Sequence, residues 1–209
     1  MANSCDRAKK IKVVLFDVDG VLTDGTIWLF PAPAAGPRST DAQAERDQDS
    51  AGYGIVSQSM IEAKGFHAHD GTAISLARLG GLKTGIVTKR ISETVALRAR
   101  DLCLDYVYQG AANKSDVLDK ILAESGVSAD AIAYVGDDVI DLPIMERCGL
   151  AIAVANARPQ VKAMAHYHTP SAGGEGAARD AVEYILQAQG TLEKVIAAYV
   201  SARTSIREQ

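Results

Sequence analysis

The feature that most constrains this chain is an apolar run, Val13 to Phe16, that leads directly into Asp17, Asp19 and Gly20. The run is too short to span a membrane and is typical of a buried strand in a parallel sheet. Asp17 and Asp19 would then lie where that strand ends, which is where open α/β sheets bind their ligands. Two carboxylates crowded at a buried strand end need a cation or a proton to coexist. The alternative is a solvated turn rich in Asp and Gly.

Apolar segments alternate with helical patterns along the rest of the chain. This alternation predicts an α/β fold, a Rossmann-like doubly wound parallel sheet with helices on both faces. Further strands are expected at residues 83–88, 105–108, 131–135 and 149–154. Helices are expected at residues 92–103, 115–125, 139–147, 177–188 and 191–202.

The length of 209 residues suits one α/β domain with a sizeable core, so we expect a single domain over residues 1–209. Residues 31–52 are rich in Pro, Ala and polar residues and nearly lack large apolar ones, which predicts a flexible loop. The loop separates Thr26–Phe30 from a strand-like run at 59–69, and a β-hairpin with an enlarged tip is the simplest explanation. We expect a C-terminal helical tail from residue 177.

Charge and composition argue against several classes of partner. The net charge of −4 gives no basic field for nucleic acid, and no apolar run approaches the roughly 20 residues of a membrane helix. The first twelve residues lack the apolar stretch of a secretory signal. Three widely spaced cysteines, Cys5, Cys103 and Cys148, suit neither a disulfide framework nor a metal site. We therefore expect a cytoplasmic protein without nucleic-acid or membrane partners.

Further polar residues fall at the predicted strand ends and helix starts, namely Thr88, Lys114, Asp137, Asp138 and Asp141. In a parallel sheet they would meet Asp17 and Asp19 at the carboxyl edge. A carboxylate can attack phosphorus, magnesium can neutralise acids and phosphate oxygens together, and a hydroxyl and an ammonium can hold the transferring group. Each residue alone also has a structural explanation, such as helix capping. The prediction of phosphoryl transfer therefore rests on their order and spacing.

This order resembles that of the haloacid dehalogenase superfamily of phosphatases. The segment Asp17–Thr23 is similar to the first motif of that family and Gly136–Asp141 to the fourth, while Thr88 and Lys114 match the second and third. The resemblance implies that Asp17 is the nucleophile. It also implies that Asp19 is the general acid/base, which protonates the leaving oxygen and then activates water.

The same resemblance implies the roles of the remaining polar residues. Asp17, the backbone carbonyl of Asp19, and Asp137 would bind Mg²⁺ as the cofactor. Asp138 and Asp141 would support the metal site. The phosphate group would be held by two residues, Thr88 and Lys114.

Longer segments resemble a small capless subfamily, whose best-known members act on 3-deoxy-D-manno-octulosonate 8-phosphate in lipopolysaccharide synthesis. These segments are Tyr134–Met145, Tyr108–Gly110 with Asn113 and Lys114, and Gly173–Arg179. Close relatives act on nine-carbon sialic-type sugar acids. The resemblance implies a homotetramer, in which a β-hairpin and the C-terminal tail of a neighbouring subunit help close the active site. It further implies that Gly173–Gly176 is a flexible gate.

Substrate-binding candidates follow from the same resemblance. Arg90 lies two residues after Thr88, where the octulosonate enzymes usually carry Arg and the nine-carbon enzymes often carry Glu. Its planar guanidinium suits a substrate carboxylate. Arg98 also matches a basic position in the subfamily.

The segment around His67, His69 and Asp70 departs from the subfamily, since Asn and Arg normally occupy the two histidine positions. On a strand, His67 and His69 would share one face, so we count them with Asp70 as candidate substrate-binding residues. A structural or surface role for the histidines is the alternative. Glu175 also differs from the octulosonate enzymes and resembles the nine-carbon relatives.

The sequence thus predicts a Mg²⁺-dependent phosphatase for a sugar-acid phosphate, either the eight-carbon 8-phosphate or a nine-carbon 9-phosphate. A signalling receiver domain would need an Asp at the inner strand end where this chain has Thr88. A phosphomutase would generally need a cap domain, and no segment between the motifs is long enough. A non-catalytic homologue serving as a binding or regulatory subunit is argued against by the retained residues Asp17, Asp19, Thr88, Lys114 and Asp137.

Overall fold

The computed structural model describes residues 3–32 and 60–205. In this part of the chain, parallel strands form a six-stranded sheet in the order β5-β4-β1-β6-β7-β8, which confirms the predicted α/β fold. The strands are β1 Val13–Phe16, β4 Lys83–Val87, β5 Tyr106–Tyr108, β6 Ile132–Gly136, β7 Leu150–Ala153 and β8 Tyr167–His168. Those predicted at 83–88, 105–108, 131–135 and 149–154 are confirmed to within one residue at each end. The loop predicted at 31–52 lies mostly outside the described residues.

The topology of the sheet reverses at β1, which is buried along its whole length. From β1 the chain passes to β4 and β5 on one side and then returns to β6, β7 and β8 on the other. Val13 is level with Lys83 of β4 and with Ile132 of β6. A crevice forms outside the carboxyl ends of the strands at such a reversal, and ligands of α/β proteins bind there. The residues that follow β1, β4 and β6 are therefore brought to one place.

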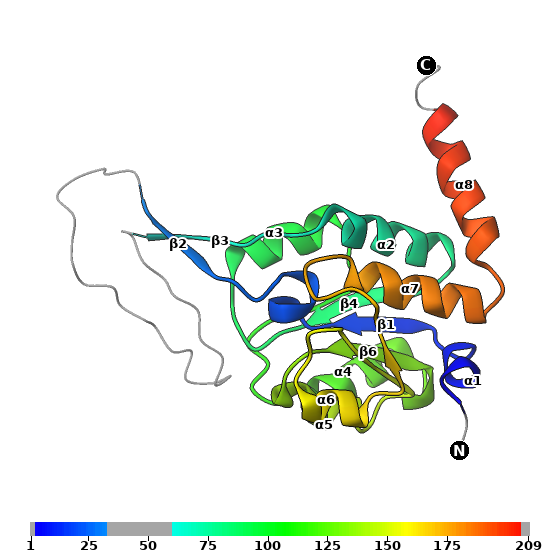
Figure 1. Ribbon diagram of the computed structural model, residues 1–209, viewed down its shortest axis with the longest axis horizontal. Coiled ribbons are helices and arrows are strands. Elements are labelled where there is room, and N and C mark those ends of the chain that lie inside the picture. Colours follow the sequence, from blue (N-terminus) through cyan, green and yellow to red (C-terminus); the bar gives the residue numbers. More distant parts are fainter. Residues whose placement is uncertain (1–2, 33–59, 206–209) are drawn as a thin grey trace.

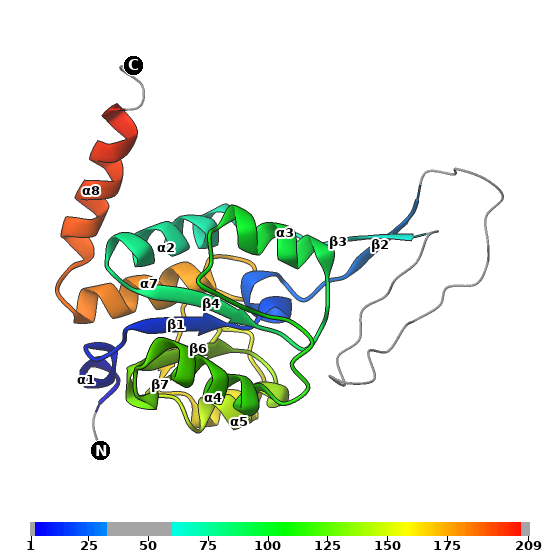
Figure 2. The same ribbon diagram turned by 180° about the vertical axis from the view of Figure 1, so that it is seen from behind.

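Helices cover both faces of the sheet. They are α1 Ser4–Ala8, α2 Ala68–Leu79, α3 Glu93–Asp101, α4 Lys114–Ser125, α5 Leu142–Met145, α6 Pro159–Met164, α7 Ala177–Ala188 and α8 Leu192–Ser205. Figures 1 and 2 show α2, α3 and α7 on one face and α4, α5 and α6 on the other, with α8 projecting from the body. The helix expected at 139–147 is divided into a 3₁₀ turn, η3 Val139–Asp141, and α5. Within the described residues, no helix combines the length and the apolar character needed to cross a membrane.

A two-stranded antiparallel hairpin projects from the end of the body opposite α8 (Figure 1). It consists of β2 Trp28–Pro31 and β3 Met60–Ala63, with Phe30 opposite Ile61. The Trp28 and Phe30 rings stack at 6.4 Å between centroids, and both side chains are exposed. The predicted hairpin is therefore present.

The strand-like run at 59–69 does not continue to its expected end. β3 ends at Ala63 and α2 begins at Ala68, with His67 as its N-cap residue. His69 lies in the first turn of this helix. The prediction that the two histidines share a strand face is wrong, because four apolar residues at helical spacing, Ala73, Ile74, Leu76 and Ala77, bury one side of α2 in the core.

Candidate active site

Asp17 lies at the carboxyl end of β1, where the chain enters the irregular turn η1 Val18–Leu22. Its side chain is buried. One carboxylate oxygen, Oδ1, accepts a hydrogen bond of 2.7 Å from the Val18 backbone N–H. The other, Oδ2, lies 2.9 Å from the Lys114 Nζ. Strand and turn thus fix Asp17 at the sheet edge with its carboxylate directed toward a lysine.

Lys114 is the first residue of α4, and only 1% of its surface is exposed. Its Nζ lies 2.6 Å from Asp141 Oδ1 and donates a hydrogen bond of 3.0 Å to the Tyr134 hydroxyl. Burial lowers the pKa of Lys114, but the ion pairs with Asp17 and Asp141 outweigh it and raise that pKa above its ordinary value. Lys114 is therefore a buried cation shared by two carboxylates.

Asp141 uses both of its carboxylate oxygens within the protein. Oδ1 accepts hydrogen bonds from Lys114 and from the Tyr134 hydroxyl, the latter at 2.7 Å. Oδ2 accepts from the backbone N–H groups of Asp137 at 2.9 Å and Asp138 at 3.2 Å. Asp138 is exposed and caps η3 through its own side chain. Asp141 therefore fixes the turn after β6, which carries Asp137.

Carboxylate oxygens of Asp17, Asp137 and Asp141 all lie within 4.8 Å of one another. Asp137 Oδ1 is buried and has no hydrogen-bond partner. Burial raises the pKa of Asp17 to about 7, and the neighbouring Asp141 adds to the rise while Lys114 opposes it. Burial and the carboxylates of Asp17 and Asp141 raise the pKa of Asp137 to about 8. A cluster of two buried acids and one half-buried acid, with an unused buried oxygen, fits a hard divalent cation such as Mg²⁺.

The raised pKa values predict how metal-free stability and Mg²⁺ binding depend on pH. Because Asp17 and Asp137 titrate near 7 and 8 rather than 3.8, their contribution to folding is complete below about pH 4 and is lost as pH rises through those values. The metal-free protein should therefore be less stable at pH 8.5 than at pH 6. Mg²⁺ binds the ionised carboxylates, so it should stabilise the fold more strongly at the higher pH.

Thermal unfolding with and without Mg²⁺ measures this effect. At pH 8.5, a free Mg²⁺ concentration one hundred times the Kd at that pH should stabilise the fold by about 2.7 kcal/mol, a Tm increase of roughly 5–10 °C, and the same concentration should have a smaller effect at pH 6. Asp137→Asn is the matched control, and it should remove most of the increase. A Tm increase that is equal or larger at pH 6 would contradict the assignment of these acids as ligands.

Glycines allow the backbone to pack tightly around the cluster. Gly20 has a φ of +93°, and a Cβ there would lie 2.2 Å from Asp137 Oδ2. A Cβ at Gly173 would lie 1.7 Å from the Gly20 carbonyl oxygen. The Gly174 N–H also donates a hydrogen bond of 3.0 Å to the Val21 carbonyl. The segment expected as a flexible gate is thus packed against η1 in this structure.

The Asp19 side chain does not belong to the three-carboxylate cluster. Its carboxylate instead forms an ion pair with Lys64, which follows β3, and lies 3.6 Å from Arg90 Nε. Thr88 directly follows β4 and is buried, with its backbone N–H bonded to the Tyr108 carbonyl at 2.9 Å. Asp19 and Thr88 therefore lie at the sheet edge where the sequence places them, and Arg90 lies beside Asp19.

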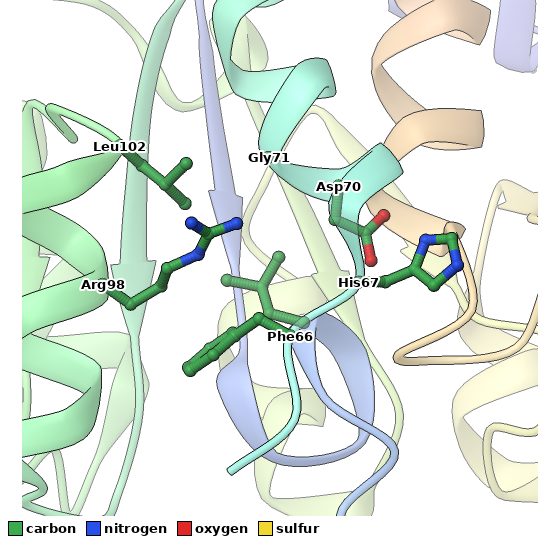
Figure 3. A pocket seen from close by; sticks show the side chains of 7 residues that line it. Phe66, His67, Asp70, Gly71, Arg98 and Leu102 are labelled. Carbon is green, nitrogen blue, oxygen red and sulfur yellow. The ribbon is translucent and has the colours of Figure 1, made fainter.

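Arg98, His67 and Asp70 line a separate small pocket between α2 and α3 (Figure 3). Arg98 pairs with Asp101 at 2.5 Å and lies over the Phe66 ring. Asp70 Oδ1 accepts from the Arg179 N–H, at the start of α7, at 3.1 Å. The structure gives Arg98, His67, His69 and Asp70 no hydrogen bond or ion pair with the acid cluster, so it does not bring these candidates into the site.

Three residues of the site were missed by the sequence analysis: Glu62, Lys64 and Tyr134. Tyr134 carries a signal, because it is a hydroxyl-bearing side chain in an otherwise aliphatic strand, and its hydroxyl bonds Asp141. Glu62 and Lys64 are spaced by two, so on an extended chain they lie on one side. Their partners are far away in the sequence, and no local pattern identifies them.

Residues 84–179 match the family model of haloacid dehalogenase-like hydrolases. Together with the doubly wound sheet and the acid cluster at its carboxyl edge, this match defines the class as a haloacid dehalogenase-like hydrolase. The chain is 33% identical to the 3-deoxy-D-manno-octulosonate 8-phosphate phosphatase KdsC of Escherichia coli K12, over 188 residues that cover 90% of this chain and 86% of the relative. The chain therefore belongs to the capless KdsC/YrbI family of 3-deoxy-D-manno-octulosonate 8-phosphate phosphatases.

Solved structures agree with this family. A probable YrbI family phosphatase from Pseudomonas syringae is 38% identical with a TM-score of 0.78, covering 94% of this chain and 97% of that one. The 3-deoxy-D-manno-octulosonate 8-phosphate phosphatase of Moraxella catarrhalis is 30% identical with a TM-score of 0.77 and the same coverage. That structure contains a magnesium ion, a phosphate ion and the sugar acid KDO.

Proposed function

We propose that this chain is a Mg²⁺-dependent phosphatase that hydrolyses 3-deoxy-D-manno-octulosonate 8-phosphate through a phosphoryl group carried on Asp17. The observation that carries the proposal is the position of the Asp17 carboxylate. It is buried at the end of β1, 2.9 Å from a buried ammonium, and shares a cluster with Asp137. The substrate is inferred from the relatives named above, which are phosphatases of this sugar-acid phosphate.

In the first step, an oxygen of the Asp17 carboxylate attacks phosphorus, and the bond from phosphorus to the sugar oxygen breaks. Asp19 gives its proton to the leaving sugar oxygen. In the second step, Asp19 takes a proton from water, which attacks the phosphorus of the acyl phosphate. Inorganic phosphate leaves and the Asp17 carboxylate is restored.

The remaining residues position the phosphoryl group and its charge. Lys114 and Thr88 bind its oxygens, and Lys114 is held for this by Asp141 and Tyr134. Asp17, Asp137 and the Asp19 carbonyl would hold Mg²⁺, which when bound neutralises the acids and the phosphate oxygens. Asp138 and Asp141 support this site through the turn after β6.

Arg90 is proposed to bind the substrate carboxylate, because it lies at the entrance beside Asp19 and its guanidinium can pair with a carboxylate. Arg98, His67, His69 and Asp70 retain a proposed substrate role only through the family resemblance. The contacts of Asp70 and Arg98 support instead a role in packing around α2, whereas His67 and His69 contact each other at the start of that helix.

We also propose the domain organisation, the oligomeric state and the cellular location of the chain. A single domain over residues 1–209 and a cytoplasmic location are consistent with the family. A homotetramer is supported by the hairpin, where Trp28, Leu29, Phe30 and Ile61 are all exposed. Apolar side chains gathered on a projecting hairpin are typical of an interaction surface.

A panel of sugar phosphates tests the proposed substrate. With Mg²⁺ present, kcat/KM for phosphate release from the eight-carbon 8-phosphate should exceed that from nine-carbon 9-phosphates and neutral sugar phosphates at least tenfold, about 1.4 kcal/mol of discrimination. Preference for a nine-carbon acid would assign the alternative substrate, which the exposed Glu175 favours. No hydrolysis of any substrate would overturn the proposed activity and support a non-catalytic role.

A further inference from the structure

The Asp19 carboxylate belongs to a closed ring of four alternating charges. Asp19 Oδ1 pairs with Lys64 Nζ, which lies 3.9 Å from Glu62 Oε1. Glu62 Oε2 lies 4.0 Å from an Arg90 terminal nitrogen, and Arg90 Nε lies 3.6 Å from Asp19 Oδ2. Each carboxylate of the ring therefore faces both cations, and the contact between Asp19 and Lys64 is the closest of the four.

Lys64 is the most deeply buried member of this ring. Its side chain is 0% exposed, whereas those of Asp19, Arg90 and Glu62 are about one-fifth exposed, at 21%, 20% and 17%. A buried ammonium needs a charged partner, and Asp19 Oδ1 is the nearest carboxylate oxygen to it. The Lys64 side chain therefore has little freedom to leave Asp19.

Glu62 is anchored to the start of α3. Its Oε1 accepts a hydrogen bond of 2.6 Å from the Ser92 hydroxyl, and its carbonyl accepts one of 3.3 Å from the Thr94 hydroxyl. The Ser92 N–H in turn donates to Gln109 Oε1 at 2.8 Å. The base of the hairpin is thus tied to the loop that follows β4, and this holds Lys64 in place.

We infer that Lys64 is a positioning residue for Asp19, and that it fixes one carboxylate oxygen so that the other faces the leaving group. This inference rests on the proposed function, in which Asp19 is the general acid/base. Asp19 sits in η1, where Gly20 has a left-handed backbone, and its side chain needs an external contact to hold one orientation. Lys64 provides that contact from a different element of the fold, 45 residues along the chain.

The dependence on the leaving group separates positioning from a general structural role. An alkyl phosphate needs Asp19 to protonate its leaving oxygen, whereas the p-nitrophenolate released from p-nitrophenyl phosphate leaves without a proton. The constant kcat/KM reports the steps up to loss of the leaving group. A variant that misplaces Asp19 should therefore lower kcat/KM for the sugar phosphate much more than for the aryl phosphate.

The experiment compares Lys64→Met with the unchanged protein on p-nitrophenyl phosphate and on the best sugar-acid phosphate, with Mg²⁺. General acid catalysis contributes about 10²–10⁴-fold, so we expect kcat/KM to fall about 10–100-fold for the sugar phosphate and less than about threefold for the aryl phosphate. Lys64→Arg should recover most of the loss. Lys83→Met, at an exposed lysine paired with Asp105, is the matched control and should change neither value.

Asp19→Asn distinguishes failure of this inference from failure of the proposed function. Asp19→Asn should show the same dependence on the leaving group, and adding Lys64→Met to it should cause no further selective loss. If Asp19→Asn lowers kcat/KM equally for both substrates, the proposed role of Asp19 is wrong. If Asp19→Asn lowers kcat/KM mainly for the sugar phosphate but Lys64→Met lowers it equally for both substrates, the positioning role of Lys64 is overturned. Should Lys64→Met not fold, Lys64→Gln is measured instead, with the same selective loss expected.

Discussion

Replacing Asp17 with Asn is expected to lower kcat/KM for the sugar-acid phosphate by roughly 10⁴- to 10⁶-fold. The amide cannot attack phosphorus, and Mg²⁺ loses a carboxylate ligand. The fold should survive, because the raised pKa of Asp17 shows that burying its charge is unfavourable. Asn removes that charge while Lys114 keeps its ion pair with Asp141.

Phosphate release and thermal unfolding of the same preparation measure both parts of this prediction. Metal-free Asp17→Asn should unfold at a Tm equal to or above that of the unchanged protein at pH 8. The exposed Asp116→Asn, in the first turn of α4, is the matched control and should retain full activity. Activity of Asp17→Asn within tenfold of the unchanged protein would remove Asp17 as the nucleophile.

Replacing Lys114 with Met should have the largest effect on stability. Lys114 is the buried cation between Asp17 and Asp141, and its loss leaves two carboxylates buried without a countercharge. Breaking a buried ion pair in this way costs about 3–5 kcal/mol of the free energy of unfolding. The variant should also lose most of its activity, because the ammonium proposed to bind the phosphate is gone.

Urea unfolding at pH 8 without metal measures the stability loss. Lys120→Met removes an exposed lysine from the same helix, and its free energy of unfolding should stay within about 0.5 kcal/mol. Mg²⁺ should restore part of the stability of Lys114→Met, since it neutralises the same carboxylates. A loss below about 1 kcal/mol would contradict the central electrostatic position given to Lys114.

The catalytic edge was predictable because its residues carry local signals. The strand before Asp17 is continuously apolar, and shorter apolar stretches precede Thr88 and Asp137, so each strand end could be located by itself. Parallel pairing then places all strand ends at one edge, whatever the order of the strands. Lys114 was predictable through its place before a helix, although its contacts with Asp141 and Tyr134 were not.

The contacts around Asp19 were not predictable because they join distant parts of the chain. Lys64 reaches Asp19 only through the path of the hairpin, and Glu62 is held by two hydroxyls at the start of α3. His67 and His69 were predicted on a strand but lie at the start of α2, because distant packing decides the structure there too. The alternation of the two histidines is compatible with a strand, but burial of Ile74 and Leu76 against the core selects a helix there.

If the phosphoryl group passes through Asp17, an acyl phosphate on that residue can be trapped. Asp19→Asn should accumulate the acyl phosphate with p-nitrophenyl phosphate and Mg²⁺, because the variant lacks the base that activates water. Quenching with acid and reducing with borohydride converts an aspartyl phosphate to homoserine, which peptide mass spectrometry locates. We expect the reduced residue at position 17 alone. Modification at another carboxylate, or continued turnover with none at position 17, would rule out Asp17 as the residue that carries the phosphoryl group.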